Sequence, residues 1–187
     1  DASRLARLAF LRKPHGTPYA KFHPPQTTLD SIEYCRGDAI EDASYSAAVS
    51  YVEALGGLLM GSASWGVIRL YYSSFYSIKS LLLLNGVVPF NGGSEMLLEL
   101  SSGAFLKGGR SSHHWNWAAI RRTAAKVQWF TSQDVEDAYA SLRGYRENVN
   151  YTHGFTDPHL HSSLISSETD LMKRFRVYRD DVTFSYT

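Results

Sequence analysis

The spacing of apolar residues along the chain predicts a mostly helical protein. In residues 42–60 they recur at steps of three and four, which gives a helix one apolar face. In residues 64–84 they cover most of a helix circumference, so we expect this second helix in the middle of a bundle. Asn85 and Gly86 both tolerate a left-handed backbone and are expected to end it.

The N-terminal part is predicted to be a short helix followed by an extended arm. Residues 2–13 carry leucines on one side and arginines on the other, which is typical of an amphipathic helix. From there to about Asp38, prolines and scattered polar residues favour an extended segment that crosses the surface. We therefore expect a domain boundary near Asp38, with the helix and arm at 1–38 and a helical domain at 39–187.

The second half of the chain is predicted to add further helices. We expect a helical turn or two at 94–100 and another helix at 117–130. Between a capping pattern at 131–134 and Gly154, apolar residues at steps of three and four predict an amphipathic helix. A last helix is expected through 171–178. The predicted fold class is therefore all-α, as an antiparallel helical bundle.

Composition narrows the class of protein further. The 187 residues are 44% hydrophobic, enough for one sizeable core and one domain with modest extensions. The formal net charge of +1 gives no overall field, so any surface for nucleic acid is local. The most apolar tract, 55–88, contains Arg69 and Lys79 and lacks a run long enough to span a membrane. A lone cysteine, Cys35, excludes an internal disulfide and fits a cytoplasmic location.

A stripe of polar residues runs beside the apolar face of the helix predicted to end at Gly154. Seven residues separate Arg146 from His153, and seven steps of about 100° return a side chain to within about 20° of its starting direction. The two residues are therefore expected on one face. The full stripe is Tyr139, Arg143, Arg146, Asn150 and His153. A polar stripe at the border of a buried face can line a cleft.

An arginine and a histidine on one face can support cleavage of a phosphodiester. Arginine binds a phosphate as a planar fork, and histidine exchanges a proton near neutral pH. RNA supplies its own nucleophile, the 2′-hydroxyl beside each phosphate, so cleavage needs proton transfer and electrostatic stabilisation and not necessarily a metal or a protein nucleophile. The alternative is a solvent-facing arginine and a histidine that interacts favourably with a helix C-terminus.

Two segments together resemble the HEPN superfamily. Residues 69–86, with the sequence RLYYSSFYSIKSLLLLNG, are similar to that family's second core helix. Residues 146–155, with the sequence RENVNYTHGF, are similar to its signature of Arg, four to six residues and then His. The resemblance implies a HEPN-like helical bundle, frequent two-fold homodimers in which the Arg and His of both subunits face each other, and metal-independent endoribonuclease activity. Catalytic members often act as toxins or antiviral defence effectors.

We expect particular roles for the residues along this helix. Arg146 is expected to anchor the phosphate and His153 to transfer protons, while Asn150 orients one or the other. Arg143 and Tyr151 are further candidates for RNA contact. The sequence departs from the family pattern at Glu147, where catalytic members commonly have Asn, Asp or His. Some members lack the catalytic pair, and this leaves a non-catalytic module open as an alternative.

A second signal for RNA lies between Glu99 and Asp134, where no acidic residue occurs and cations alternate with aromatic rings. The cations are Lys107, Arg110, Arg121, Arg122 and Lys126. Phosphates attract such cations, and unpaired bases stack on exposed rings. The alternative is that the rings belong to the core and the charges to a solvated face.

No metal site or cofactor is predicted. The pairs His113-His114 and His159-x-His161 match no strong zinc spacing and have no cysteine nearby. The expected partners are RNA, a second copy of the chain as a homodimer, and a cognate antitoxin or regulatory protein, with no membrane contact. Two rival functions remain open: a non-catalytic HEPN module that binds a nucleotide or a protein, and a structural dimerisation domain of a larger protein.

Overall fold

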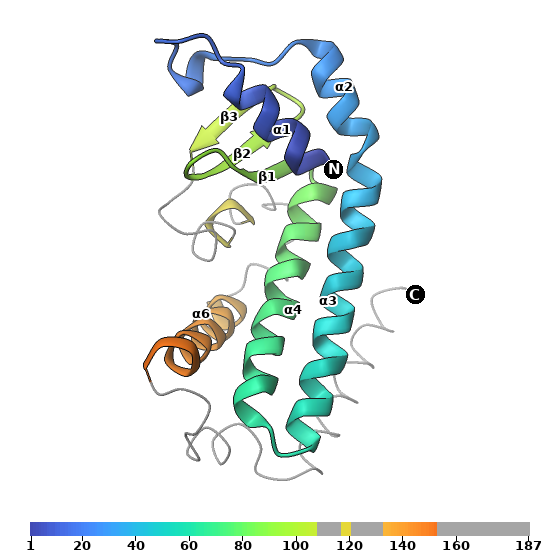
Figure 1. Ribbon diagram of the computed structural model, residues 1–187, viewed down its shortest axis with the longest axis vertical. Coiled ribbons are helices and arrows are strands. Elements are labelled where there is room, and N and C mark those ends of the chain that lie inside the picture. The colour runs from blue at the N-terminus through green and yellow to red at the C-terminus, as the bar shows by residue number, and fades with distance from the viewer. Residues whose placement is uncertain (108–116, 121–132, 153–187) are drawn as a thin grey trace.

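The computed structural model describes residues 1–107, 117–120 and 133–152, and the account below concerns these ranges. The described part is mostly helical, with one small three-stranded sheet (Figure 1). Its elements are α1 (Ala2–Leu11), η1 (Tyr19–Lys21), α2 (Gln26–Tyr34), α3 (Arg36–Leu59), α4 (Ala63–Leu84), β1 (Val87–Asn91), β2 (Glu95–Glu99), β3 (Ala104–Lys107), α6 (Gln133–Glu147) and η3 (Asn148–Thr152). The long helices α3 and α4 lie side by side, with α1, α2 and the sheet at one end and α6 beside α4 (Figure 1).

Helices α3 and α4 confirm the two core helices predicted from the spacing of apolar residues. As expected, α4 ends directly before Asn85, and Gly86 adopts a left-handed φ of 73° that favours glycine. The guanidinium of Arg36, in the first turn of α3, donates to the carbonyl oxygen of Leu83 at 2.9 Å. This bond satisfies one of the carbonyls at the C-terminal end of α4 and ties the two helices together.

Small residues let α3 and α4 approach each other closely. The Ser73 hydroxyl of α4 donates to the backbone carbonyl of Ala47 in α3 at 2.9 Å. Near the turn between the helices, a Cβ at Gly66 would lie 2.6 Å from Cγ of Leu58, so glycine is required for this contact. The pair is therefore a tightly joined scaffold on which the other elements are placed.

The N-terminal region differs from the extended arm that the sequence predicts. Helix α1 confirms the first predicted helix, but α2 replaces the second part of the arm. Pro25 precedes the first residue of α2, where a proline favours the start of a helix, and Leu29 and Ile32 are buried one turn apart. Because α3 begins at Arg36, the boundary expected near Asp38 falls in its first turn. The division of the chain into domains stays a prediction.

The mostly helical class is confirmed, but a small sheet is present that the all-α prediction lacks, and its strand β2 replaces the helical turn expected at 94–100. Strands β1, β2 and β3 form an antiparallel meander in which Val88 pairs with Leu98 and Leu98 with Phe105. These three residues face a core cluster shared with α1 and α2, whereas Val87 and Leu97 face a second cluster shared with α4 and α6. Both faces are buried, so the strands lack the alternation of apolar and polar residues that identifies a half-exposed strand.

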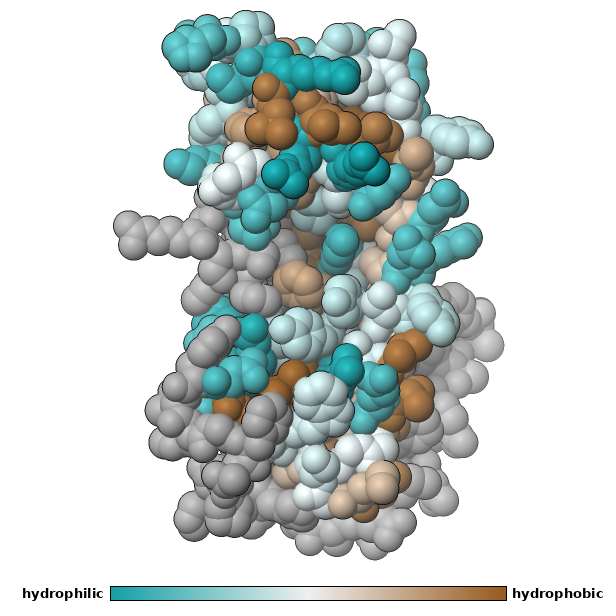
Figure 2. Space-filling model, viewed as in Figure 1, coloured by the Kyte–Doolittle hydropathy of each residue, from teal (hydrophilic) through white to brown (hydrophobic). Residues whose placement is uncertain are grey.

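None of the helices in the described ranges has both the length and the apolarity that a membrane crossing requires. The face shown in Figure 2 is largely polar, with apolar residues gathered near α1, where Leu8 and Leu11 are exposed. Helix α6 packs against α4, which brings Arg146 next to the segment at 69–86.

Candidate functional site

Helix α6 carries two of the predicted site residues, Arg143 and Arg146, together with Tyr139 of the polar stripe. Its first turn contains Asp134 and Glu136 and its last turn contains Arg146, which is the charge distribution that a helix dipole favours. Val135 and Leu142 pack toward α4, as the apolar spacing predicts, and Val149 is fully buried beside Ile68. The amphipathic helix predicted before Gly154 is therefore confirmed over Gln133–Glu147.

Arg146 lies under the aromatic rings of α4. Only 8% of its surface is exposed. Its guanidinium carbon lies 5.6 Å from the ring centre of Tyr71 and 5.9 Å from that of Tyr72, both within the range of a cation–π contact. Its Nη2 also donates to the Tyr72 hydroxyl at 3.4 Å. The arginine is thus held in a fixed position between two helices that are far apart in sequence.

Two buried tyrosines extend this cluster toward the start of α6. Tyr71 and Tyr139 have ring centres 5.9 Å apart, and the Tyr139 ring stacks on Trp117 at 5.5 Å. Burial, followed by the neighbouring Tyr139 hydroxyl, raises the pKa of Tyr71 far above its ordinary value. Burial also raises the pKa of Tyr139, although its hydrogen bond with Tyr71 and the charge of Arg143 act in the opposite direction. Both phenols are therefore uncharged at neutral pH.

The backbone changes from α-helix to π-helix directly after this arginine, at Asn148–Thr152. A π turn closes with an i→i+5 hydrogen bond, so each residue covers a smaller angle than in an α-helix, and such turns are frequent at functional sites. The expectation that Arg146 and His153 share a face assumed α-helical steps, which the structure does not have at 148–152. His153 itself lies outside the described residues.

The other predicted site residues have different surroundings. Asn150 is exposed although Arg146 is buried, so the predicted stripe does not form one solvent-facing row. Arg143 is half-buried, and its Nε lies 3.8 Å from Oε1 of Glu147, the residue that departs from the family pattern. Lys107 is exposed at the end of β3. The side chain of Tyr151 is not described, and Arg110, Arg121, Arg122 and Lys126 lie outside the described residues.

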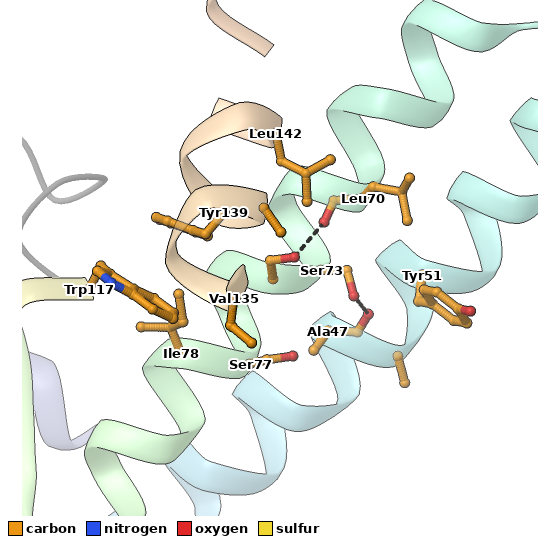
Figure 3. Close-up of a pocket in the computed structure, with 13 residues that line it drawn as sticks. Ala47, Tyr51, Leu70, Ser73, Ser77, Ile78, Trp117, Val135, Tyr139 and Leu142 are labelled. Atoms are coloured by element: carbon orange, nitrogen blue, oxygen red, sulfur yellow. Dashed lines mark hydrogen bonds between the residues drawn. The ribbon is translucent and has the colours of Figure 1, made fainter. Parts of the chain in front are cut away.

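A cavity of about 470 Å³ lies between α3, α4 and α6. Tyr139 and Trp117 form part of its wall, but Arg146 does not line it (Figure 3). Of the predicted polar stripe, Tyr139 lines this cavity, whereas Arg143, Arg146 and Asn150 do not. In the described part of the chain, no group of three His, Cys, Asp or Glu side chains is placed to hold a metal ion.

Sequence reasoning did not identify two features of this site. Tyr71 and Tyr72 belong to a helix that is apolar around most of its circumference, and no pattern in the sequence indicates that their rings meet Arg146. The cavity depends on three helices at once, so no local signal marks it. Comparisons of the chain with protein-family models, with curated proteins and with solved structures find no match.

Proposed function

We propose that this protein is a metal-independent endoribonuclease of the HEPN type, in which Arg146 anchors the phosphate and His153 transfers protons. The observation that supports the proposal is the contact between the two segments of the resemblance. Arg146, the first residue of the 146–155 segment, donates to Tyr72 of the 69–86 segment and lies against two of its rings. Arg146 and the 69–86 segment therefore meet at one place in the fold.

The proposed reaction uses the 2′-hydroxyl of the RNA as nucleophile. A base removes its proton while the 2′-oxygen bonds to the adjacent phosphorus, and the bond from phosphorus to the 5′-oxygen breaks. The leaving 5′-oxygen receives a proton, so the products are a 2′,3′-cyclic phosphate and a 5′-hydroxyl end. His153 supplies the proton transfer, and the guanidinium of Arg146 stabilises the charge that develops on the phosphoryl oxygens.

The surroundings of Arg146 suit an anchor that is already in position before RNA arrives. Two ring faces and one hydroxyl restrain the guanidinium, so binding a phosphate loses little side-chain freedom. In a partly buried site its charge also acts more strongly than it would in water. Arg143 and exposed Asn150 are close in sequence and assist phosphate contact in this proposal, whereas Lys107 extends it along the RNA.

The proposal includes a two-fold homodimer in the cytoplasm, with a cognate antitoxin or regulatory protein as a further partner. Exposed apolar residues on α3 support a dimer, since they follow steps of three, four and seven along one side of the helix. They are Tyr45, Val49, Val52 and Leu59, with exposed fractions of 74%, 37%, 66% and 56%. Such a stripe is typical of a helix face that packs on another helix. The free thiol of Cys35 fits a reducing compartment.

The second candidate is a HEPN-type module that binds a nucleotide or a protein without cleaving RNA. The observation that favours it is the burial of Arg146, because a guanidinium that is 8% exposed and hydrogen-bonded to Tyr72 can serve packing alone. The two candidates differ in what His153 does, and this difference can be measured.

The test compares cleavage of single-stranded RNA by the parent and by His153→Ala, with His23→Ala, at an exposed histidine of the described part, as a control. Cleavage by His153→Ala should fall by about two to four orders of magnitude, with RNA affinity nearly unchanged. Arg146→Ala should lose cleavage and also bind RNA more weakly. The double variant should be hardly worse than either single variant, because the residues act as a unit.

Two further controls test the proposed chemistry, one with a modified substrate and one with a chelator. RNA methylated at the 2′-hydroxyl should bind and stay uncut, and cleavage of unmodified RNA should continue in excess EDTA. If His153→Ala is folded and cleaves RNA as fast as the parent, the nuclease assignment is wrong and the non-catalytic module is preferred. A requirement for a divalent ion would exclude the proposed mechanism.

A further inference from the structure

The cavity between α3, α4 and α6 is lined without a charged side chain from any described residue. Val135 and Leu142 of α6 and Ile78 of α4 contribute apolar side chains to its wall (Figure 3). The ring of Tyr139 closes one end and Tyr51 of α3 lies toward the other (Figure 3). A buried charge without a partner is strongly unfavourable, so this space suits an uncharged molecule and is unsuitable for the phosphates of RNA.

The shape of the cavity follows from large residues on one side and small residues on the other. Trp117 and Tyr139 stack with an angle of 16° between their rings, and Tyr139 also contacts Tyr71 of α4. These rings fill the space between α6 and α4 at one end. Beyond them the wall contributed by α3 and α4 consists largely of alanine and serine, including Ala47 and Ser74, which are too small to fill the remaining space.

The serines in this wall differ in their hydrogen bonds. Ser73 donates to the carbonyl of Ala47 at 2.9 Å, and Ser74 donates to the carbonyl of Leu70 at 3.1 Å (Figure 3). Ser77 forms no hydrogen bond within the described part of the chain, and its hydroxyl points into the cavity (Figure 3). The wall therefore offers a mostly apolar surface with the Ser77 hydroxyl available for a bound molecule.

We propose that this cavity binds an uncharged, mostly apolar ring compound that carries one hydroxyl or similar group, with Ser77 as its hydrogen-bond partner. The volume of about 470 Å³ falls within the roughly 300–1,000 Å³ of ordinary small-molecule sites, which combine apolar walls with a few polar groups. Aromatic walls favour a planar ligand, because rings attract each other when stacked with an offset or edge to face. The proposal does not depend on RNA cleavage.

The experiment uses 2-naphthol and naphthalene as probes, with binding to the whole chain followed by ligand-observed NMR. Both probes should show saturable binding. Ala138→Phe places a ring at the mouth of the cavity, whereas Ala140→Phe adds the same ring to an exposed position of α6 that does not line it. The first variant should raise the Kd of both probes at least tenfold, and the second should leave both Kd values unchanged. Melting temperatures establish that each variant is folded.

A second pair of variants tests the chemistry of the site. Ser77→Ala should weaken the binding of 2-naphthol about threefold to tenfold, because it removes one neutral hydrogen bond. The binding of naphthalene should be unchanged. Ser74→Leu fills the cavity from α4 and should exclude both probes, which keeps the test decisive if Ala138→Phe does not fold. The proposal is overturned if neither probe saturates, or if folded cavity-filling variants bind both probes as the parent does. Equal weakening of the two probes by Ser77→Ala would overturn the role of Ser77.

Discussion

The cores at the two ends of the molecule are packed from different kinds of side chain. At the sheet end, formed by α1, α2 and β1–β3, the core cluster consists of apolar side chains, and the rings of Phe10, Phe90 and Phe105 meet at 5.5–5.7 Å. At the α6 end, where α6 packs on α4, the structure instead buries Tyr139 and Arg146 and leaves a cavity between α6 and α3. Close apolar packing provides stability, whereas buried polar groups and open space lower it and are typical of sites that bind or react. The contrast shows that the sheet end is packed for stability, and it favours the α6 end as the location of the proposed site.

The largest expected effect is a difference in how much a core substitution at each end lowers the free energy of unfolding. Phe105→Ala removes a ring that is 2% exposed and contacts Phe10, Phe22 and Phe90, so the free energy of unfolding should fall by about 3–5 kcal/mol. Leu142→Ala at the α6 end should lower it by only about 1–2 kcal/mol, because Leu142 is half-buried and already borders a cavity. Urea unfolding measures both values. Equal losses would mean that the two ends are packed alike.

A smaller effect concerns the buried tyrosines and pH. The pKa of Tyr71 and that of Tyr139 are raised in the folded protein, so both keep their protons above pH 10 while the unfolded chain loses them. Their contribution to stability is complete below pH 10 and declines as pH rises from there. Each such tyrosine should add about 1.4 kcal/mol per pH unit to the decline in the free energy of unfolding.

The measurement for this prediction is urea unfolding of the parent and of Tyr71→Phe between pH 9 and pH 11. The variant should show the shallower decline, because phenylalanine has no proton to lose. Tyr45→Phe, at a residue that is 74% exposed, serves as the control and should decline as the parent does. A parent curve that is flat across this range would contradict the burial of uncharged phenols at the α6 end.

The smallest expected effect tests whether Tyr72 is a positioning residue for Arg146. Tyr72→Phe keeps the ring but removes the hydroxyl that accepts from Nη2 of Arg146 at 3.4 Å. If the proposed nuclease function holds, cleavage should fall by about fivefold, equivalent to about 1 kcal/mol for one hydrogen bond, mainly through kcat. Tyr76→Phe is the control, because it removes a hydroxyl from the same helix and from a ring that stacks on Tyr72, whereas the cation–π contacts of Arg146 are with Tyr71 and Tyr72. A purely structural role for Tyr72 would lower the melting temperature without this change in kcat.

Parts of this fold could be read from the sequence because their cause is local. The steps of three and four that identify α3, α4 and α6 depend only on neighbours along one helix, and Gly86 ends α4 through its own backbone freedom. Local rules failed at α2, where the proline pair reads as an extended arm but instead precedes a helix. They also failed at the sheet, since burial of both faces removes the alternation that marks a strand.

The sequence by itself determined the main helices, and it placed Arg146 near the end of one of them. Only the tertiary structure decided what surrounds that arginine, because Tyr71 and Tyr72 meet it across more than seventy residues of chain. The cavity is likewise a product of three helices, and its size depends on how Trp117 and Tyr139 stack between them. Periodicity records which side of a helix is buried, but it contains no information about which partner covers that side, and the chemistry of a site depends on the partner.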